Sequence, residues 1–132
     1  MNQINCVELE KLFDDLARDE WASSEKAFPL AFCHLLAEKC LLLQSEGLFH
    51  PAAIGKGANK INDQAIRSDF TSWIEDDTTS VLLRELREQI DLMRIMLNQN
   101  FYLWLKSFEA HFAVYPAGAE YKKHMDNHKV SI

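Results

Sequence analysis

The sequence predicts an α+β fold built from a single domain of 132 residues. Two observations carry this prediction: apolar residues recur at helical spacing early in the chain, and they alternate with polar residues in its last third. A further helical pattern lies between these regions. Hydrophobic residues form 48% of the chain and aromatic residues 11%, which is enough to build a core, so we expect the chain to fold rather than to stay disordered.

Residues 1–46 are predicted to be helical. Asn5 is a suitable N-cap for the first helix, and apolar residues then return every three or four positions as far as Trp21. A second helix is predicted from Pro29, a residue favoured in the first turn, to Gly47, a residue that commonly ends helices. Residues 40–43 are apolar almost all round the helix, so we expect this part to be substantially buried.

Residues 47–63 read as a loop, because glycine, proline and asparagine recur there. The rest of the domain, residues 64–132, is predicted to combine strands with one long helix. The first strand is expected over residues 66–74, where Phe70 and Trp73 are separated by polar residues.

The long helix follows this strand. Its N-cap is one of three adjacent hydroxyl residues: Thr78, Thr79 or Ser80. The apolar residues that follow keep a three-four rhythm, typical of a helix with one apolar face, and the pattern frays near Asn98.

The last third is predicted to form a hairpin of strands. Apolar residues alternate with others over residues 108–114, which places His111 on the opposite face from Phe112. Residues 116–118 have the composition of a turn, and residues 120–126 are expected to form the returning strand.

Composition argues against several classes of partner. The net charge of −6, spread along the chain, disfavours nucleic-acid binding, which needs a basic surface. No apolar run has the length of a membrane span, and the N-terminus lacks the basic and apolar parts of a signal peptide. Cys6, Cys33 and Cys40 follow no pattern, which favours thiols in a reducing compartment. We therefore expect a cytoplasmic protein that binds neither nucleic acid nor membrane.

His124 and Asp126 are the most suggestive pair of functional residues. Two positions apart on an extended strand, their side chains point the same way. They can then supply two ligands of the 2-His-1-carboxylate triad that binds non-haem Fe(II). His128 is a local candidate for the third ligand, but on a straight strand it lies about 13 Å from His124 at the backbone, so a tight turn at Asn127 would be needed.

Two motifs in this order make the chain resemble a known family. Residues 66–75 read Ile-Arg-Ser-Asp-Phe-Thr-Ser-Trp-Ile-Glu, which is similar to the Ile-Arg-Gly-Asp-x-x-x-Trp strand of the prolyl-hydroxylase branch of the 2-oxoglutarate/Fe(II) dioxygenases. Residues 115–127 read Tyr-Pro-Ala-Gly-Ala-Glu-Tyr-Lys-Lys-His-Met-Asp-Asn, which resembles the Tyr-Pro-x-Gly-x-x-Tyr-x-x-His-x-Asp segment of that branch. The bacterial hydroxylases similar to the oxygen-sensing prolyl hydroxylases of animals are the relatives that the chain resembles most.

This resemblance implies a cofactor set and the residues that hold it. The cofactors would be Fe(II) and 2-oxoglutarate, with ascorbate as a further candidate. His124 and Asp126 match the first two iron ligands of the branch, and Tyr115 matches a tyrosine that lines the co-substrate pocket. The activity implied is hydroxylation of a prolyl residue in a protein substrate.

The resemblance also implies a fold and a substrate-binding region. The fold would consist of N-terminal helices and one long helix packed on an incomplete double-stranded β-helix, a relative of the jelly roll. Asp69 and Tyr121 match residues near the prolyl substrate and the mobile active-site loop. Trp73 matches an aromatic residue close to the same mouth.

The chain departs from the family pattern in two places. Ser68 replaces the usual glycine of the first motif. The family's distal histidine and its 2-oxoglutarate-binding arginine lie well past the His-x-Asp motif, and residues 127–132 contain no arginine. We therefore expect the 132 residues to represent the N-terminal part of such a dioxygenase domain and to be inactive alone.

An alternative without catalysis stays open at this point. Strands that lack neighbours expose unpaired backbone N–H and C=O groups, and these can pair with another chain. The chain would then act as a helical and strand-edge interaction module, or would associate with itself.

Overall fold

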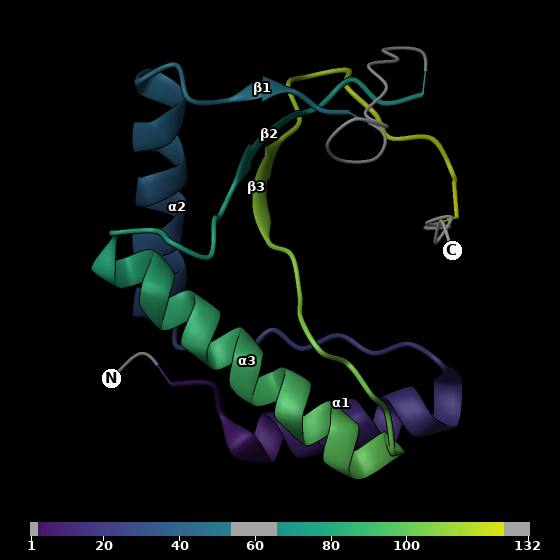
Figure 1. The fold of residues 1–132 in the computed structure, drawn as a ribbon. Helices are drawn as coiled ribbons and strands as arrows, with labels where there is room; N and C mark the ends of the chain where they lie inside the picture. Colours follow the sequence, from purple (N-terminus) through teal and green to yellow (C-terminus); the bar gives the residue numbers. More distant parts are fainter. Residues whose placement is uncertain (1–2, 54–65, 126–132) are drawn as a thin grey trace. The chain divides into compact units, whose positions relative to one another are not determined.

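The computed structural model describes residues 3–53 and 66–125. It contains three helices, α1 (Cys6–Asp19), α2 (Leu30–Ser45) and α3 (Val81–Phe101) (Figure 1). Its strands are β1 (His50–Pro51), β2 (Phe70–Trp73) and β3 (His111–Val114). The predicted α+β class is confirmed by this content of helices and antiparallel strands.

The chain divides into two compact units, each made from two separate stretches of sequence. The first unit combines Met1–Leu42 with Ile74–Ala110, and it holds α1, most of α2 and all of α3. The second unit combines Leu43–Trp73 with the segment that begins at His111, and it holds the three strands.

In the first unit, α1 packs against α3 through apolar side chains. Leu9 and Phe13 of α1 are buried, and the rings of Phe13 and Phe101 meet edge to face with their centroids 5.9 Å apart. The predicted cap is confirmed, because the Asn5 side chain accepts hydrogen bonds from the backbone N–H groups of Val7 and Glu8 at 3.0 and 3.2 Å. These contacts fix the start of α1 and its apolar face.

Helix α3 shows which of the three candidate caps is used. The Ser80 side chain accepts a hydrogen bond from the backbone N–H of Leu83 at 3.3 Å. The helix continues past the expected fraying point to Phe101. Beyond it, the Asn98 side-chain amide exchanges two hydrogen bonds of 3.0 Å with the backbone of Leu105, which ties the outgoing chain back to the helix.

The expected burial of residues 40–43 in α2 is wrong. Leu41 is 64% exposed and Leu42 is 50% exposed, and Phe32 is the buried residue of the helix. A helix that is apolar on every side needs neighbours on every side, and the described residues cover only part of its surface.

Within the described part of the chain, no helix combines the length and the apolar character needed to cross a bilayer.

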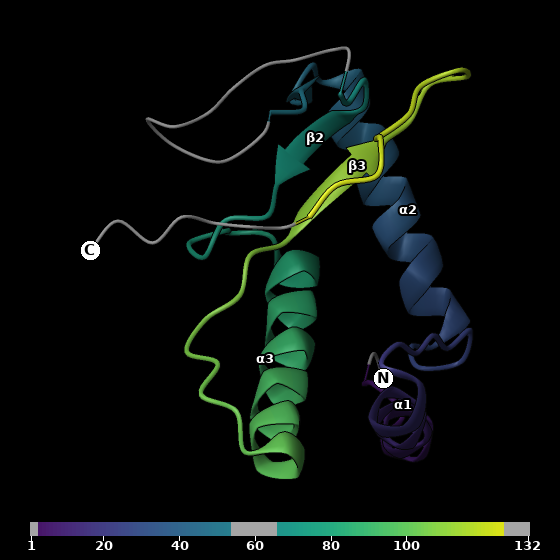
Figure 2. The same ribbon diagram turned by 90° about the vertical axis from the view of Figure 1, so that its right-hand side faces the viewer.

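The strands of the second unit form an antiparallel sheet in the order β1-β2-β3. Phe70 pairs with Val114 and Trp73 with His111, so β2 and β3 run side by side in opposite directions (Figure 2). The predicted strand at 66–74 is confirmed over Phe70–Trp73. The predicted loop at 47–63 contains the short strand β1, and its residues 54–63 lie outside the described range.

The predicted returning strand at 120–126 is wrong over its described part. A returning strand would pair with β3, but Tyr121 instead forms an antiparallel bridge with Arg67, just before β2. This bridge lies on the same side of the β2 segment as β3. If the register of β3 continued, Ala117 would lie opposite Arg67, but Tyr121 lies there instead. The turn therefore inserts four residues, after which the chain again pairs with the segment that leads into β2. The turn at residues 116–118 is closed by a hydrogen bond from the Ala119 N–H to the Pro116 carbonyl, with Gly118 at φ 84°.

Candidate functional site

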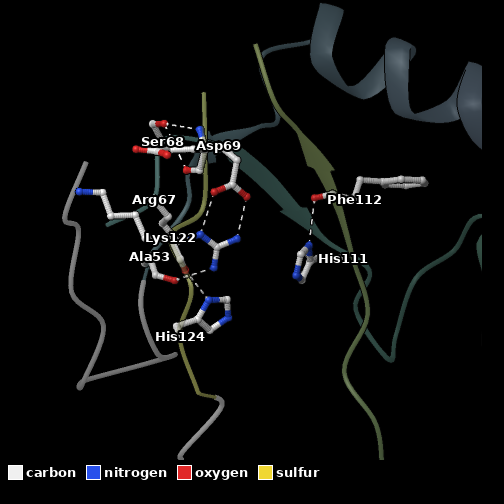
Figure 3. A network of polar contacts seen from close by, with 9 residues as sticks. Ala53, Arg67, Ser68, Asp69, His111, Phe112, Lys122 and His124 are labelled. Atoms are coloured by element: carbon white, nitrogen blue, oxygen red, sulfur yellow. Dashed lines mark hydrogen bonds and ion pairs between the residues drawn. The ribbon is translucent and has the colours of Figure 1, made fainter. Parts of the chain in front are cut away.

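A buried ion pair between Arg67 and Asp69 lies at the centre of the candidate site. Residues two apart on an extended segment project to the same face, which brings the two side chains together. The guanidinium donates through Nε and Nη2 to the two carboxylate oxygens at 2.8 and 2.7 Å (Figure 3). The Asp69 side chain is 0% exposed and that of Arg67 is 11% exposed, so the pair is shielded from water.

This pair sets the electrostatics of its surroundings. The hydrogen bonds from Arg67 hold the pKa of the Asp69 carboxyl below its ordinary value, although burial opposes the shift. The same bonds raise the pKa of the Arg67 guanidinium. The partial burial of Tyr115, followed by the negative charge of the nearby Asp69, raises the pKa of the Tyr115 hydroxyl.

Tyr121 connects the ion pair to His124. The Arg67 guanidinium lies over the Tyr121 ring, 4.0 Å from its centroid, because the two residues face each other across the bridge. The His124 imidazole stacks on the same ring, with the centroids 3.6 Å apart and the planes 7° from parallel. A continuous set of contacts therefore leads from Asp69 to the imidazole.

The backbone fixes which nitrogen of His124 can bind a metal. Nδ1 lies 2.8 Å from the Lys122 carbonyl oxygen (Figure 3). A carbonyl oxygen only accepts, so Nδ1 carries the proton and the lone pair of the neutral ring is on Nε2. Histidines that bind metals are commonly held in this way, so the residue fits a ligand position.

The other predicted metal-binding residues lie past the end of the described chain. Asp126 and the alternative ligand His128 lie outside the described range. Among residues 3–53 and 66–125, no three histidine, cysteine or acidic side chains gather closely enough to hold a metal ion. Of the two predicted ligands, the structure describes His124 alone.

Trp73 lies away from this set of contacts. Its ring meets that of His111 edge to face, at 5.1 Å between centroids, across the paired strands β2 and β3. Trp73 is six residues beyond Arg67, which corresponds to about 20 Å along an extended chain. The structure therefore places Trp73 at the far end of β2 from Arg67. It groups the other four described site residues around Arg67: Asp69, Tyr115, Tyr121 and His124.

Two contributors were missed in reading the sequence. Arg67 links the predicted residues, and its position two before Asp69 in a predicted strand was a usable signal. Ser68, noted only as a replacement for glycine, hydrogen-bonds through its hydroxyl to both the N–H and the carbonyl of Glu120, at 2.9 and 3.3 Å. No local pattern reveals the Ser68 contact, because Glu120 is 52 residues away.

Comparison with known proteins shows what this chain is similar to. No family model matches the chain. No curated protein matches its sequence. Among solved structures, the chain is similar to part of a prolyl-4-hydroxylase, so the resemblance to the prolyl-hydroxylase branch of the 2-oxoglutarate/Fe(II) dioxygenases is confirmed.

One such solved structure is a prolyl-4-hydroxylase from Pseudomonas putida. The two share 32% sequence identity with a TM-score of 0.78, over 90% of this chain. The chain spans 61% of the length of that relative, which agrees with the expected match to the N-terminal portion of such a protein.

Proposed function

We propose that this chain carries part of the active site of a 2-oxoglutarate- and Fe(II)-dependent dioxygenase that hydroxylates a prolyl residue of a protein. His124 and Asp126 are the proposed iron ligands. The observation that carries the proposal is the orientation of His124, whose Nδ1 is bonded to the Lys122 carbonyl so that Nε2 can bind a metal. The 32% identity to a prolyl-4-hydroxylase supports the same assignment.

Tyr115 is the proposed contact of the co-substrate. Its ring is about half exposed, so it remains accessible to a ligand, and its hydroxyl interacts with the buried Asp69. When bound, Fe(II), 2-oxoglutarate and O2 together supply the oxidising chemistry that converts a C–H bond to an alcohol, with release of succinate and CO2. A tyrosine hydroxyl is an O–H donor, so the proposed role of Tyr115 is to donate a hydrogen bond to the carboxylate of the co-substrate.

Asp69, Trp73 and Tyr121 are proposed to serve the prolyl substrate. Asp69 is completely buried, so its contribution would pass through Arg67 and Tyr115 rather than through direct contact. Trp73 is an exposed strand residue and could meet a peptide directly. The incomplete double-stranded β-helix belongs to the proposal as well, with the antiparallel strands β1 to β3 as its described part.

Metal binding provides the decisive test. Mn(II), a stand-in for Fe(II) that does not oxidise readily, should broaden the NMR signals of the His124 ring in the wild-type chain. A His124→Ala variant should lose the binding, and a His34→Ala variant should keep it because His34 lies on α2. Equal Mn(II) affinity of the wild type and the His124→Ala variant would refute the proposal.

We also propose that the chain alone does not turn over 2-oxoglutarate. One observation supports this: the Arg67 guanidinium is already paired with Asp69 and is therefore not available to the carboxylate of the co-substrate. A succinate-release assay with Fe(II), 2-oxoglutarate and ascorbate tests the proposal. Succinate formation that requires His124 would contradict it.

Self-association is a second candidate function, favoured by one observation. In the described part of the sheet, β3 pairs with β2 and forms an edge. An edge strand offers backbone groups to a further strand, so a second copy could add to the sheet there. Sedimentation with and without a chelator distinguishes the candidates, because a dimer built on a strand edge should not respond to removal of metal.

A further inference from the structure

We propose that Arg67 is a positioning residue for the metal ligand His124 and acts on it through the ring of Tyr121. This inference rests on the proposed function, because it assigns a role toward a metal that His124 would bind. It gives a role to Arg67, which lies within the first motif but was not among the predicted site residues.

The first step is the anchoring of Arg67 itself. Its Nε and Nη2 groups donate to Asp69, and its Nη1 group lies 3.4 Å from the Ala53 carbonyl oxygen (Figure 3). A guanidinium held along one edge by a buried carboxylate has one orientation. Because this edge is occupied, Arg67 is poorly suited to bind the carboxylate of a co-substrate and well suited to hold a neighbour in place.

The second step is the contact between Arg67 and Tyr121. Arg67 and Tyr121 are paired across the two extended segments, and hydrogen bonds on both sides fix the pairing: Ser68 N–H to the Glu120 carbonyl and Lys122 N–H to the Ile66 carbonyl, each 2.9 Å. The guanidinium sits 4.0 Å from the ring centroid, close enough for a cation–π contact. The ring of Tyr121 is therefore held by its backbone and by Arg67 together.

The third step is the contact between Tyr121 and His124. The imidazole lies nearly parallel to the Tyr121 ring, and its Nδ1 donates to the Lys122 carbonyl. Because the imidazole is stacked on a ring and its Nδ1 is hydrogen-bonded, the lone pair of its Nε2 points in one fixed direction. Loss of Arg67 should allow the Tyr121 ring to reorient, and the imidazole would lose its support.

NMR spectroscopy of the full 132-residue chain tests the positioning role without any need for activity. In the wild type, nuclear Overhauser contacts should join the Arg67 side chain to the Tyr121 ring and that ring to His124. The stacked ring should also shift the His124 ring protons upfield. Arg67→Gln should move these signals toward unstructured values and weaken Mn(II) binding by about tenfold.

Matched variants separate positioning from loss of fold. Arg18→Gln removes an arginine of α1 that is ion-paired on the surface and should leave the His124 signals unchanged. Tyr121→Phe keeps the ring and should keep the upfield shift, whereas Tyr121→Leu should abolish it. If Arg67→Gln fails to fold, the inference is still tested by the wild-type nuclear Overhauser contacts and by the comparison of Tyr121→Phe with Tyr121→Leu.

The outcomes distinguish this inference from the function on which it rests. If Mn(II) broadens His124 in the wild type, and Arg67→Gln changes neither the ring shifts nor the affinity, the positioning role is overturned. Absence of the wild-type contact between Arg67 and Tyr121 overturns it as well. If Mn(II) does not broaden His124 in the wild type, the proposed function itself fails.

Discussion

Asp69 and Arg67 form a two-point ion pair with bonds of 2.8 and 2.7 Å, in which the carboxylate has no exposed surface. The Arg67 guanidinium lies over the Tyr121 ring, and the charges of both partners act on the hydroxyl of Tyr115. Burial makes removal of either partner costly, because whichever partner remains is a charge out of contact with water.

Replacement of Asp69 by alanine should destabilise the chain by about 3 kcal/mol, because Arg67 would be left as an unpaired and largely buried charge. Urea unfolding measures the change. Asp15→Ala is the matched control, since it removes an exposed carboxylate that also pairs with an arginine at 2.8 Å. Exposed pairs contribute little, so a comparable loss in both variants would contradict the assigned burial.

The contribution of Asp69 to stability should disappear in acid. Its folded-state pKa lies below the ordinary value of 3.8, because Arg67 favours the charged form. The group therefore adds stability above pH 3.8, and this stability is lost as the pH falls through the folded-state pKa. The unfolding free energies of the wild type and Asp69→Asn should differ by a constant amount above pH 3.8. The difference should shrink as the pH falls from 3.8 through the folded-state pKa of Asp69. A difference that ignores pH would argue against the ion pair.

The hydroxyl of Tyr115 should ionise at lower pH when Asp69 is replaced by asparagine. Burial comes first among the causes that raise its pKa above the ordinary value of 10.0, followed by the negative charge of Asp69, while Arg67 opposes both. Asp69→Asn removes the negative charge and leaves the opposing positive one. Carbon-13 NMR of the Tyr115 ring follows the titration, with Asp15→Asn as a control; an unchanged pKa would place Asp69 out of electrostatic reach of Tyr115.

Ser68→Ala should loosen one backbone amide while leaving its neighbour protected. The Glu120 N–H donates to the Ser68 hydroxyl at 2.9 Å, whereas the Lys122 N–H donates to the Ile66 carbonyl. Loss of the hydroxyl should cost about 1 kcal/mol, or roughly a five- to tenfold faster hydrogen exchange at Glu120. The Lys122 amide serves as an internal control. Equal protection of Glu120 in both proteins would show that its amide is satisfied in another way.

Core and surface leucines should respond very differently to truncation. Leu9 is 0% exposed within the contact of α1 and α3, so Leu9→Ala should cost about 3 kcal/mol through lost burial and a residual cavity. Leu41 is 64% exposed on α2, so Leu41→Ala should change stability by less than about 0.5 kcal/mol. Chemical denaturation of the two variants measures both effects. A large loss in Leu41→Ala would indicate that α2 is covered in solution.

Local patterns determined the elements that depend on nearby residues. Capping by Asn5, the three-four rhythm of α3 and the alternation around β3 are all set within a few residues, and each prediction agrees with the structure. The resemblance to prolyl hydroxylases could also be identified from sequence, because its motifs are short, spaced and ordered. The roles of Asp126, Tyr115 and the other predicted site residues remain proposals.

The sequence by itself therefore determined the helices, the α+β class and the family resemblance of this chain. Only the tertiary structure decided that Leu41 and Leu42 of α2 are exposed, that residues 120–122 continue along the β3 side of the strand, and that Arg67 joins Asp69 to Tyr121. The reason is physical: caps and periodicities arise between residues close in sequence. Burial and strand pairing arise between segments far apart in the sequence, as for Ser68 and Glu120, which are 52 residues apart.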